Sequence, residues 1–136
     1  MTDLPKSEEE WRAKLSPERY KVLREENTEP PFSGKLLHNK ENGEYTCGAC
    51  GAVIFKSDSK YDSTTPGLIG WPSFSEVASN DAVDLIDDNS FFMHRIEVRC
   101  KTCGSHLGHL FDDKSSPTGQ HYCINSVSLD FKPEAK

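Results

Sequence analysis

The chain has 136 residues, of which 35% are hydrophobic, and this is enough for one domain with a single core. The formal net charge of -6, together with the lack of any basic run, argues against a surface that binds nucleic acid. No apolar segment follows the start MTDLPKSEEEW, and none approaches the length that spans a bilayer. We therefore expect a cytoplasmic protein that does not contact the membrane.

Two short helices are expected near the N-terminus. Ser7 and Glu10 fit a capping box, and Ser16-Pro17-Glu18 is a second start signal with a cap, a proline in the first turn and an acid at the positive end of the dipole. The second helix must end by Glu29, because Pro30-Pro31 cannot continue it. We expect a single domain over residues 1–136, in which 1–13 are peripheral and 132–136 form a tail.

After the prolines, clusters of Gly, Pro, Ser, Asn and Asp interrupt short apolar runs, which is typical of a small β structure. The expected strands are Glu44–Thr46, Val53–Phe55, His94–Arg99, Leu107–Phe111 and Tyr122–Phe131. In the third of these, Ile96 and Val98 alternate with charged residues, as in a strand with one apolar face.

Four of the five cysteines form two CxxC turns, each followed by glycine: Cys47-Gly-Ala-Cys50 and Cys100-Lys-Thr-Cys103. Two such turns make a tetrahedral zinc site with sulfurs about 2.3 Å from the metal, and four thiolates leave no open position, which indicates a structural zinc. Two disulfides are the alternative, disfavoured in a reducing compartment, and a redox CxxC is disfavoured because neither pair begins a helix in a βαβ unit. The predicted fold is mostly β, with small antiparallel sheets around a four-cysteine zinc site and short N-terminal helices.

Cys123 is left over from these pairs. On a strand, His121, Cys123 and Asn125 share one face. A lone cysteine there is compatible with a small buried hydrophobe, and also with a nucleophile if proton donors lie nearby.

The stretch from His106 to Asp113, HLGHLFDD, offers such donors in His106, His109 and Asp113. Two alternatives remain open for it: polar packing, or a second metal site with Asp113 or Cys123 as a further ligand. Trp71 lies in the Gly-flanked stretch Gly70-Trp71-Pro72-Ser73-Phe74, where its ring either packs in the core or forms an apolar wall for a ligand.

With these motifs in order, the chain resembles the methionine sulfoxide reductases of the B type. The resemblance is carried by the two CxxC turns, by GWPSF, by HLGHLFDD, by PTGQHYCINSVSLDF at residues 117–131 and by TEPPFSGKLL at residues 28–37, and it covers about residues 15–131. It implies a mostly β fold with structural Zn²⁺ and reduction of the R epimer of methionine sulfoxide in oxidised proteins or peptides.

By position, the resemblance makes Cys123 the catalytic residue and Trp71 the ring that receives the substrate's methyl group. Polar active-site positions fall on His106, His109, Asp113 and Asn125. We also count His121 among the candidate catalytic residues, and we assign Phe74 and Phe111 as further substrate contacts. The implied chemistry is attack of the Cys123 thiolate on the sulfoxide sulfur, which leaves a sulfenic acid that a second thiol reduces.

The sequence departs from the family at three places. Many members have a resolving cysteine where Ile69 stands, so we expect Cys123 to be recycled by an external thiol such as thioredoxin, a glutaredoxin or glutathione. We expect the protein to be a monomer. His121 stands where arginine is usual; if it stabilises the thiolate, that help should fade above its pKa and a His121→Arg variant should remove the pH dependence. Lys114-Ser115 replace a usual Gly-Pro.

A second class of function fits the same features. The chain could be a zinc-stabilised module that binds a peptide or another ligand, with Cys123 buried and inert. The surplus cysteine beside His, Asp and Asn side chains favours the enzyme, because a binding module does not require that cluster.

Overall fold

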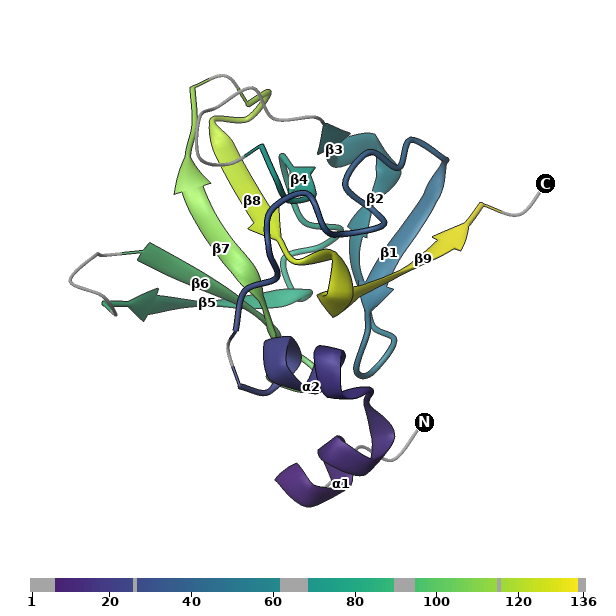
Figure 1. The fold of residues 1–136 in the computed structure, drawn as a ribbon. Helices are drawn as coiled ribbons and strands as arrows, with labels where there is room; N and C mark the ends of the chain where they lie inside the picture. Colours follow the sequence, from purple (N-terminus) through teal and green to yellow (C-terminus); the bar gives the residue numbers. More distant parts are fainter. Residues whose placement is uncertain (1–6, 26, 62–68, 90–94, 115, 135–136) are drawn as a thin grey trace.

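The computed structural model of the protein describes residues 7–25, 27–61, 69–89, 95–114 and 116–134. Two short helices, α1 (Glu8–Lys14) and α2 (Pro17–Leu23), lie together at one end of the molecule (Figure 1). The side chains of Ser7 and Ser16 cap them by accepting from backbone N–H groups three residues on, which confirms both predicted starts. In the part of the chain that is described, no helix is long and apolar enough to cross a membrane.

The rest of the chain forms two antiparallel sheets, which confirms the mostly β prediction (Figure 1). The three-stranded sheet has the order β2 (Val53–Lys56), β1 (Gly43–Cys47), β9 (Leu129–Pro133). The six-stranded sheet has the order β3 (Lys60–Tyr61), β4 (Ser73–Phe74), β8 (Gln120–Ile124), β7 (His106–Asp112), β6 (Arg95–Cys100), β5 (Val83–Asp88). Single 3-10 turns, Ser57–Ser59 and Ser126–Ser128, lead into β3 and β9.

The prediction of one strand over Tyr122–Phe131 was wrong. β8 ends at Ile124, and the 3-10 turn Ser126–Ser128 carries the chain into β9 of the other sheet (Figure 1). The N–H of Ser128 donates to the carbonyl of Asn125 at 3.1 Å, so the backbone turns instead of extending the ladder. The residues after Asn125 therefore do not continue the face of Cys123. Strand β5 was not predicted, and His94 lies outside the described residues.

Aromatic rings fill the core between the sheets. Phe74 is fully buried and stacks on Phe55 with ring centroids 4.1 Å apart, and Tyr45 meets Phe74 edge-on. Trp11 of α1 also belongs to this core and is 3% exposed.

Candidate active site

A row of polar side chains crosses the six-stranded sheet at Cys123. Cys123 on β8 is directly opposite Ser73 on β4 and His109 on β7, and His109 is in turn opposite Glu97 on β6. Residues that are directly opposite in an antiparallel pair project to the same face of the sheet. The sheet register therefore brings a thiol, a hydroxyl, an imidazole and a carboxylate into one line.

Cys123 lies in a pocket of about 120 Å³. The residues that line it are Thr28, Trp71, Arg95, Gly108, His109, Phe111, Cys123 and Asn125. Five of these were predicted as site residues, while Thr28, Arg95 and Gly108 were not. The Phe74 ring does not line this pocket, because it points into the core, so its position does not support a substrate contact.

Burial raises the pKa of the Cys123 thiol to about 12, and the nearby negative charge of Glu29 acts in the same direction. The thiol form therefore dominates at neutral pH in the free protein. A reaction at Cys123 needs a base that takes this proton or a bound group that stabilises the thiolate.

His109 is the histidine that reaches the pocket. Its Nε2 lies 2.8 Å from Oδ2 of Asp88, and Arg95 Nη2 lies 3.5 Å from the same oxygen. Burial lowers the pKa of His109, although the hydrogen bond to Asp88 opposes the shift. The ring is thus neutral at neutral pH, with the proton on Nε2 toward the carboxylate and Nδ1 left as the basic nitrogen.

His106 lies beside the pocket rather than in its lining. Its Nδ1 is 2.7 Å from Oε2 of Glu97, and its ring is 5.4 Å from that of His109. Although burial opposes ionisation, contacts with His106 and Arg99 lower the pKa of Glu97 to about 2. Nε2 of His106 is buried and has no hydrogen-bond partner among the described residues.

His121 and Asp113 also stand outside the pocket lining. His121 is fully buried, with Nδ1 2.9 Å from Oδ2 of Asp113 and Nε2 2.8 Å from Oγ of Ser73. Burial lowers the pKa of His121, and Asp113 opposes the shift only in part. His121 therefore carries no charge at neutral pH, and its two ring nitrogens contact Asp113 and Ser73.

Asn125 presents a fixed amide to the pocket. Its Nδ2 donates to the carbonyl of Leu107 at 3.1 Å, and its Oδ1 accepts from the N–H of Glu29 at 3.0 Å. The Trp71 ring is fixed in a similar way, because its Nε1–H donates to the carbonyl of Glu29 at 2.9 Å.

The other four cysteines gather at one point, as their spacing predicted. The four sulfurs lie within 4.8 Å of one another, with Cys47 3.7 Å from Cys103 and Cys50 3.6 Å from Cys100. All five cysteines lie in the described part of the chain, and none is in a disulfide. Among those residues, the four cysteines are also the only group that could hold a metal, so the geometry does not support a second site at HLGH.

The cluster joins the two sheets. Cys47 ends β1 of the smaller sheet and Cys100 ends β6 of the larger one. Gly51 and Gly104 follow the two turns with φ of 85° and 75°, a conformation that favours glycine. Four cysteine sulfurs, with no oxygen ligand among them, form a donor set that suits zinc.

Cations from the two helices contact this cluster through backbone carbonyls. Lys14 Nζ lies 2.8 Å from Ala49 O, and Arg19 Nη1 lies 3.1 Å from Gly48 O, both in the first turn. Arg24 Nη1 donates to Cys103 O in the second turn at 3.0 Å. The helices thus brace both cysteine turns.

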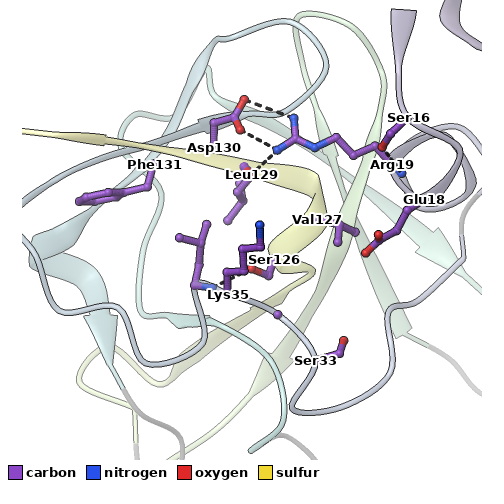
Figure 2. Close-up of a pocket in the computed structure, with 12 residues that line it drawn as sticks. Ser16, Glu18, Arg19, Ser33, Lys35, Ser126, Val127, Leu129, Asp130 and Phe131 are labelled. Carbon is purple, nitrogen blue, oxygen red and sulfur yellow. Dashed lines mark hydrogen bonds and ion pairs between the residues drawn. The ribbon is translucent and has the colours of Figure 1, made fainter. Parts of the chain in front are cut away.

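A second hollow of about 330 Å³ lies between α2, the loop at residues 33–36 and β9 (Figure 2). The bidentate ion pair of Arg19 with Asp130, at 2.6 and 3.3 Å, closes one side of it. None of the candidate site residues lines this hollow, but Ser126 and Val127, which follow Asn125, form part of its wall.

Comparison with known proteins agrees with this geometry. The SelR domain matches residues 15–133. The chain is 60% identical over 129 residues to "Peptide methionine sulfoxide reductase MsrB" of Methanosarcina barkeri, covering 95% of this chain and 88% of that protein. It is 52% identical to the protein of the same name from Leifsonia xyli subsp. xyli, covering 96% and 92% of the two chains. It is also 48% identical to mouse "Methionine-R-sulfoxide reductase B3, mitochondrial", covering 93% of this chain and 49% of that protein. The chain therefore belongs to the MsrB family of peptide methionine sulfoxide reductases.

Proposed function

We propose that the protein reduces the R epimer of methionine sulfoxide in proteins and peptides to methionine, with Cys123 as the nucleophile. The observation that carries the proposal is the pocket itself, which places one surplus cysteine beside an indole ring, a neutral imidazole and a fixed amide. The names of the relatives, one of which specifies the R sulfoxide, support the same reaction.

In the proposed first step, the neutral His109 takes the proton of the Cys123 thiol through Nδ1 as the sulfur attacks the sulfoxide sulfur. The same proton is then delivered to the sulfoxide oxygen. This oxygen bonds to the Cys123 sulfur as its bond to the substrate sulfur and the bond between the two sulfurs break, so that Cys123 becomes a sulfenic acid and methionine leaves. The raised pKa of Cys123 makes this paired proton transfer necessary, because little thiolate exists before the substrate binds.

The choice of epimer follows from two fixed groups. The Trp71 ring receives the substrate's methyl group, and Asn125 and His109 face the oxygen. Only one epimer of the sulfoxide can place its methyl group on the Trp71 ring and its oxygen toward Asn125 and His109 at the same time. Phe111 and Arg95 extend the pocket wall on the side of β6 and β7.

The sulfenic acid is recycled by an external thiol. One reductant thiol displaces water to form a mixed disulfide with Cys123, and a second thiol releases Cys123 and leaves as a disulfide. The other four cysteines are gathered in the cluster and are 3.6–3.7 Å from their neighbours, so none is offered as the internal partner. The reductants that we propose are thioredoxin, a glutaredoxin and glutathione. We also propose that the protein is a monomer in the cytoplasm.

The four-cysteine cluster is proposed to hold a structural Zn²⁺. Cys47, Cys50, Cys100 and Cys103 would be its four ligands, and the metal would link the two sheets without taking part in the reaction. The helix cations at the neighbouring carbonyls favour the negative charge that four thiolates bring.

The central test is turnover of matched peptides that contain R- or S-methionine sulfoxide, with each reductant supplied in turn. We expect reduction of the R peptide alone, and loss of turnover in Cys123→Ser. Binding of both peptides without reduction would instead establish the ligand-binding module. Mass analysis of the oxidised enzyme tests the recycling step separately, because an intramolecular disulfide at Cys123 would exclude direct attack by an external thiol.

A further inference from the structure

Glu29 is a buried acid close to the pocket, and only 4% of its surface is exposed. Its Oε1 accepts from the N–H of Val127 at 2.9 Å, while Oε2 is buried without a hydrogen-bond partner among the described residues. Burial raises the pKa of this carboxyl above its ordinary range. Burying a carboxyl group without full hydrogen bonding costs free energy, so its position calls for a structural or functional reason.

The backbone of Glu29 makes two further hydrogen bonds, and both go to pocket side chains. Its N–H donates to Oδ1 of Asn125 at 3.0 Å, and its carbonyl accepts from Nε1–H of Trp71 at 2.9 Å. Trp71 lies two residues before β4 and Asn125 directly follows β8, and these two strands pair at Ser73 and Cys123. One residue therefore fixes two separate walls of the pocket.

The segment that carries Glu29 has little freedom to relax. Phe32 N–H donates to the carbonyl of Gly70 at 2.8 Å, and a Cβ on Gly70 would lie 2.5 Å from Cβ of Pro31. At the other end, a Cβ on Gly34 would lie 2.2 Å from Cβ of Ser126 and 2.7 Å from Oε2 of Glu29. The carboxylate is thus a side-chain tether between this segment and the turn after Asn125, beside the hydrogen bond from Leu36 N–H to Oγ of Ser126 at 2.9 Å; Ser126 and Val127 appear in Figure 2.

We propose that Glu29 is a positioning residue, whose side chain anchors the backbone groups that hold Trp71 and Asn125 around Cys123. Glu29 does not line the pocket and does not touch the substrate, so it acts through these two residues. The catalytic meaning of this role rests on the proposed sulfoxide reduction, but the hydrogen bond to Trp71 can be observed without it.

Three variants separate the parts of this proposal. Glu29→Gln keeps an acceptor for Val127 N–H and should preserve the pocket. Glu29→Ala removes the tether, and Glu29→Asp keeps the charge on a side chain one carbon too short, which gives a second test if the alanine variant does not fold. Ile54→Val, a buried change in β2 of the other sheet, is the control for general loss of stability.

The first readout is hydrogen exchange of the Trp71 indole N–H, one of two indole signals because the chain has two tryptophans. We expect exchange at least roughly ten-fold faster in Glu29→Ala and Glu29→Asp, since the anchored acceptor is released. The second readout is kinetics on the R-sulfoxide peptide, where KM should rise about ten-fold in both variants and stay within about two-fold in Glu29→Gln.

The outcomes are distinguishable. Unchanged exchange and KM in Glu29→Ala and Glu29→Asp would overturn the positioning role, as would equal changes in Ile54→Val. If the wild-type protein does not turn over sulfoxide but its indole exchange responds to the Glu29 variants, the proposed function fails while the structural role of Glu29 stands.

Discussion

His121 and Asp113 form a buried hydrogen bond of 2.9 Å next to the candidate nucleophile, and the second nitrogen of His121 contacts Ser73. His121 itself carries no charge at neutral pH, and it stands where the resemblance to the family leads us to expect a permanently charged arginine. Its consequences can be measured through stability and through the reactivity of Cys123.

The first prediction concerns acid stability. Because burial lowers the folded-state pKa of His121, the unfolded chain binds its proton first as the pH falls through about 6.5. The unfolding free energy should therefore decrease below that pH, by at most about 1.4 kcal/mol per pH unit for one histidine. Denaturant titrations between pH 7.5 and about 5 should show a shallower loss in His121→Gln, since His109 and the carboxyls are common to both proteins. Parallel curves would mean that His121 titrates alike in both states.

The second prediction concerns the thiol. A His121→Arg variant introduces a fixed positive charge beside Asp113 and should lower the pKa of Cys123 from its raised value of about 12. Alkylation rates of Cys123 measured against pH should shift toward lower pH in this variant. His121→Gln controls for the change of shape without charge, and its profile should match the wild type. Identical profiles in all three proteins would make His121 a spectator.

The third prediction uses Gly108, which lies between the two histidines on β7. A Cβ at this position would lie 2.1 Å from the carbonyl oxygen of Cys123 and 2.9 Å from Cα of Ile124. Gly108→Ala must push β7 from β8, so we expect a loss of about 1–3 kcal/mol in stability and a larger fractional loss of turnover. Gly119→Ala is the matched comparison, because its Cβ meets nothing within 4 Å although its φ is 81°. Its cost should be near 1 kcal/mol, with turnover largely kept. Equal effects at both glycines would contradict this account.

The fourth prediction concerns the metal. Native mass spectrometry should show one zinc per chain in the wild type and in Cys123→Ser, and none in Cys47→Ser or Cys100→Ser. Chelation should lower the unfolding temperature of the first two proteins only. Zinc that disappears with Cys123→Ser would place that cysteine in the metal site and end its role as nucleophile.

Local signals predicted the helices well, since the caps at Ser7 and Ser16 are set by neighbours in the chain. The sequence from Tyr122 to Phe131 misled because Val127, Leu129 and Phe131 alternate with polar residues as in a strand. In the structure Ser126–Ser128 form a turn, and both serines are buried. Strand β5 was missed because its aspartates and exposed Leu85 resemble a loop, and its partner β6 is what makes it a strand.

The candidate site was expected from its reactive side chains and from the resemblance to the family. The differences arise where the contacts of a residue in space do not follow from its neighbours in the sequence. Glu29 and Arg95 were missed because their roles come from contacts with distant strands and loops rather than from a motif. Phe74 belongs to the same GWPSF stretch as Trp71, but it directly follows Ser73, which is opposite Cys123. Adjacent residues in a strand point to opposite sides, so the Phe74 side chain points into the core.

The polar row across β4, β8, β7 and β6 makes the site a property of strand register. Inserting one residue within β7 before His109, or within β8 before Cys123, would turn every later side chain of that strand to the opposite face and remove His109 or Cys123 from the site. Insertions or deletions confined to the connection after Asp113 would leave the register of β7 with β6 and with β8 unchanged. Variation among relatives should therefore gather in that connection, while these two strands keep their length to the residue.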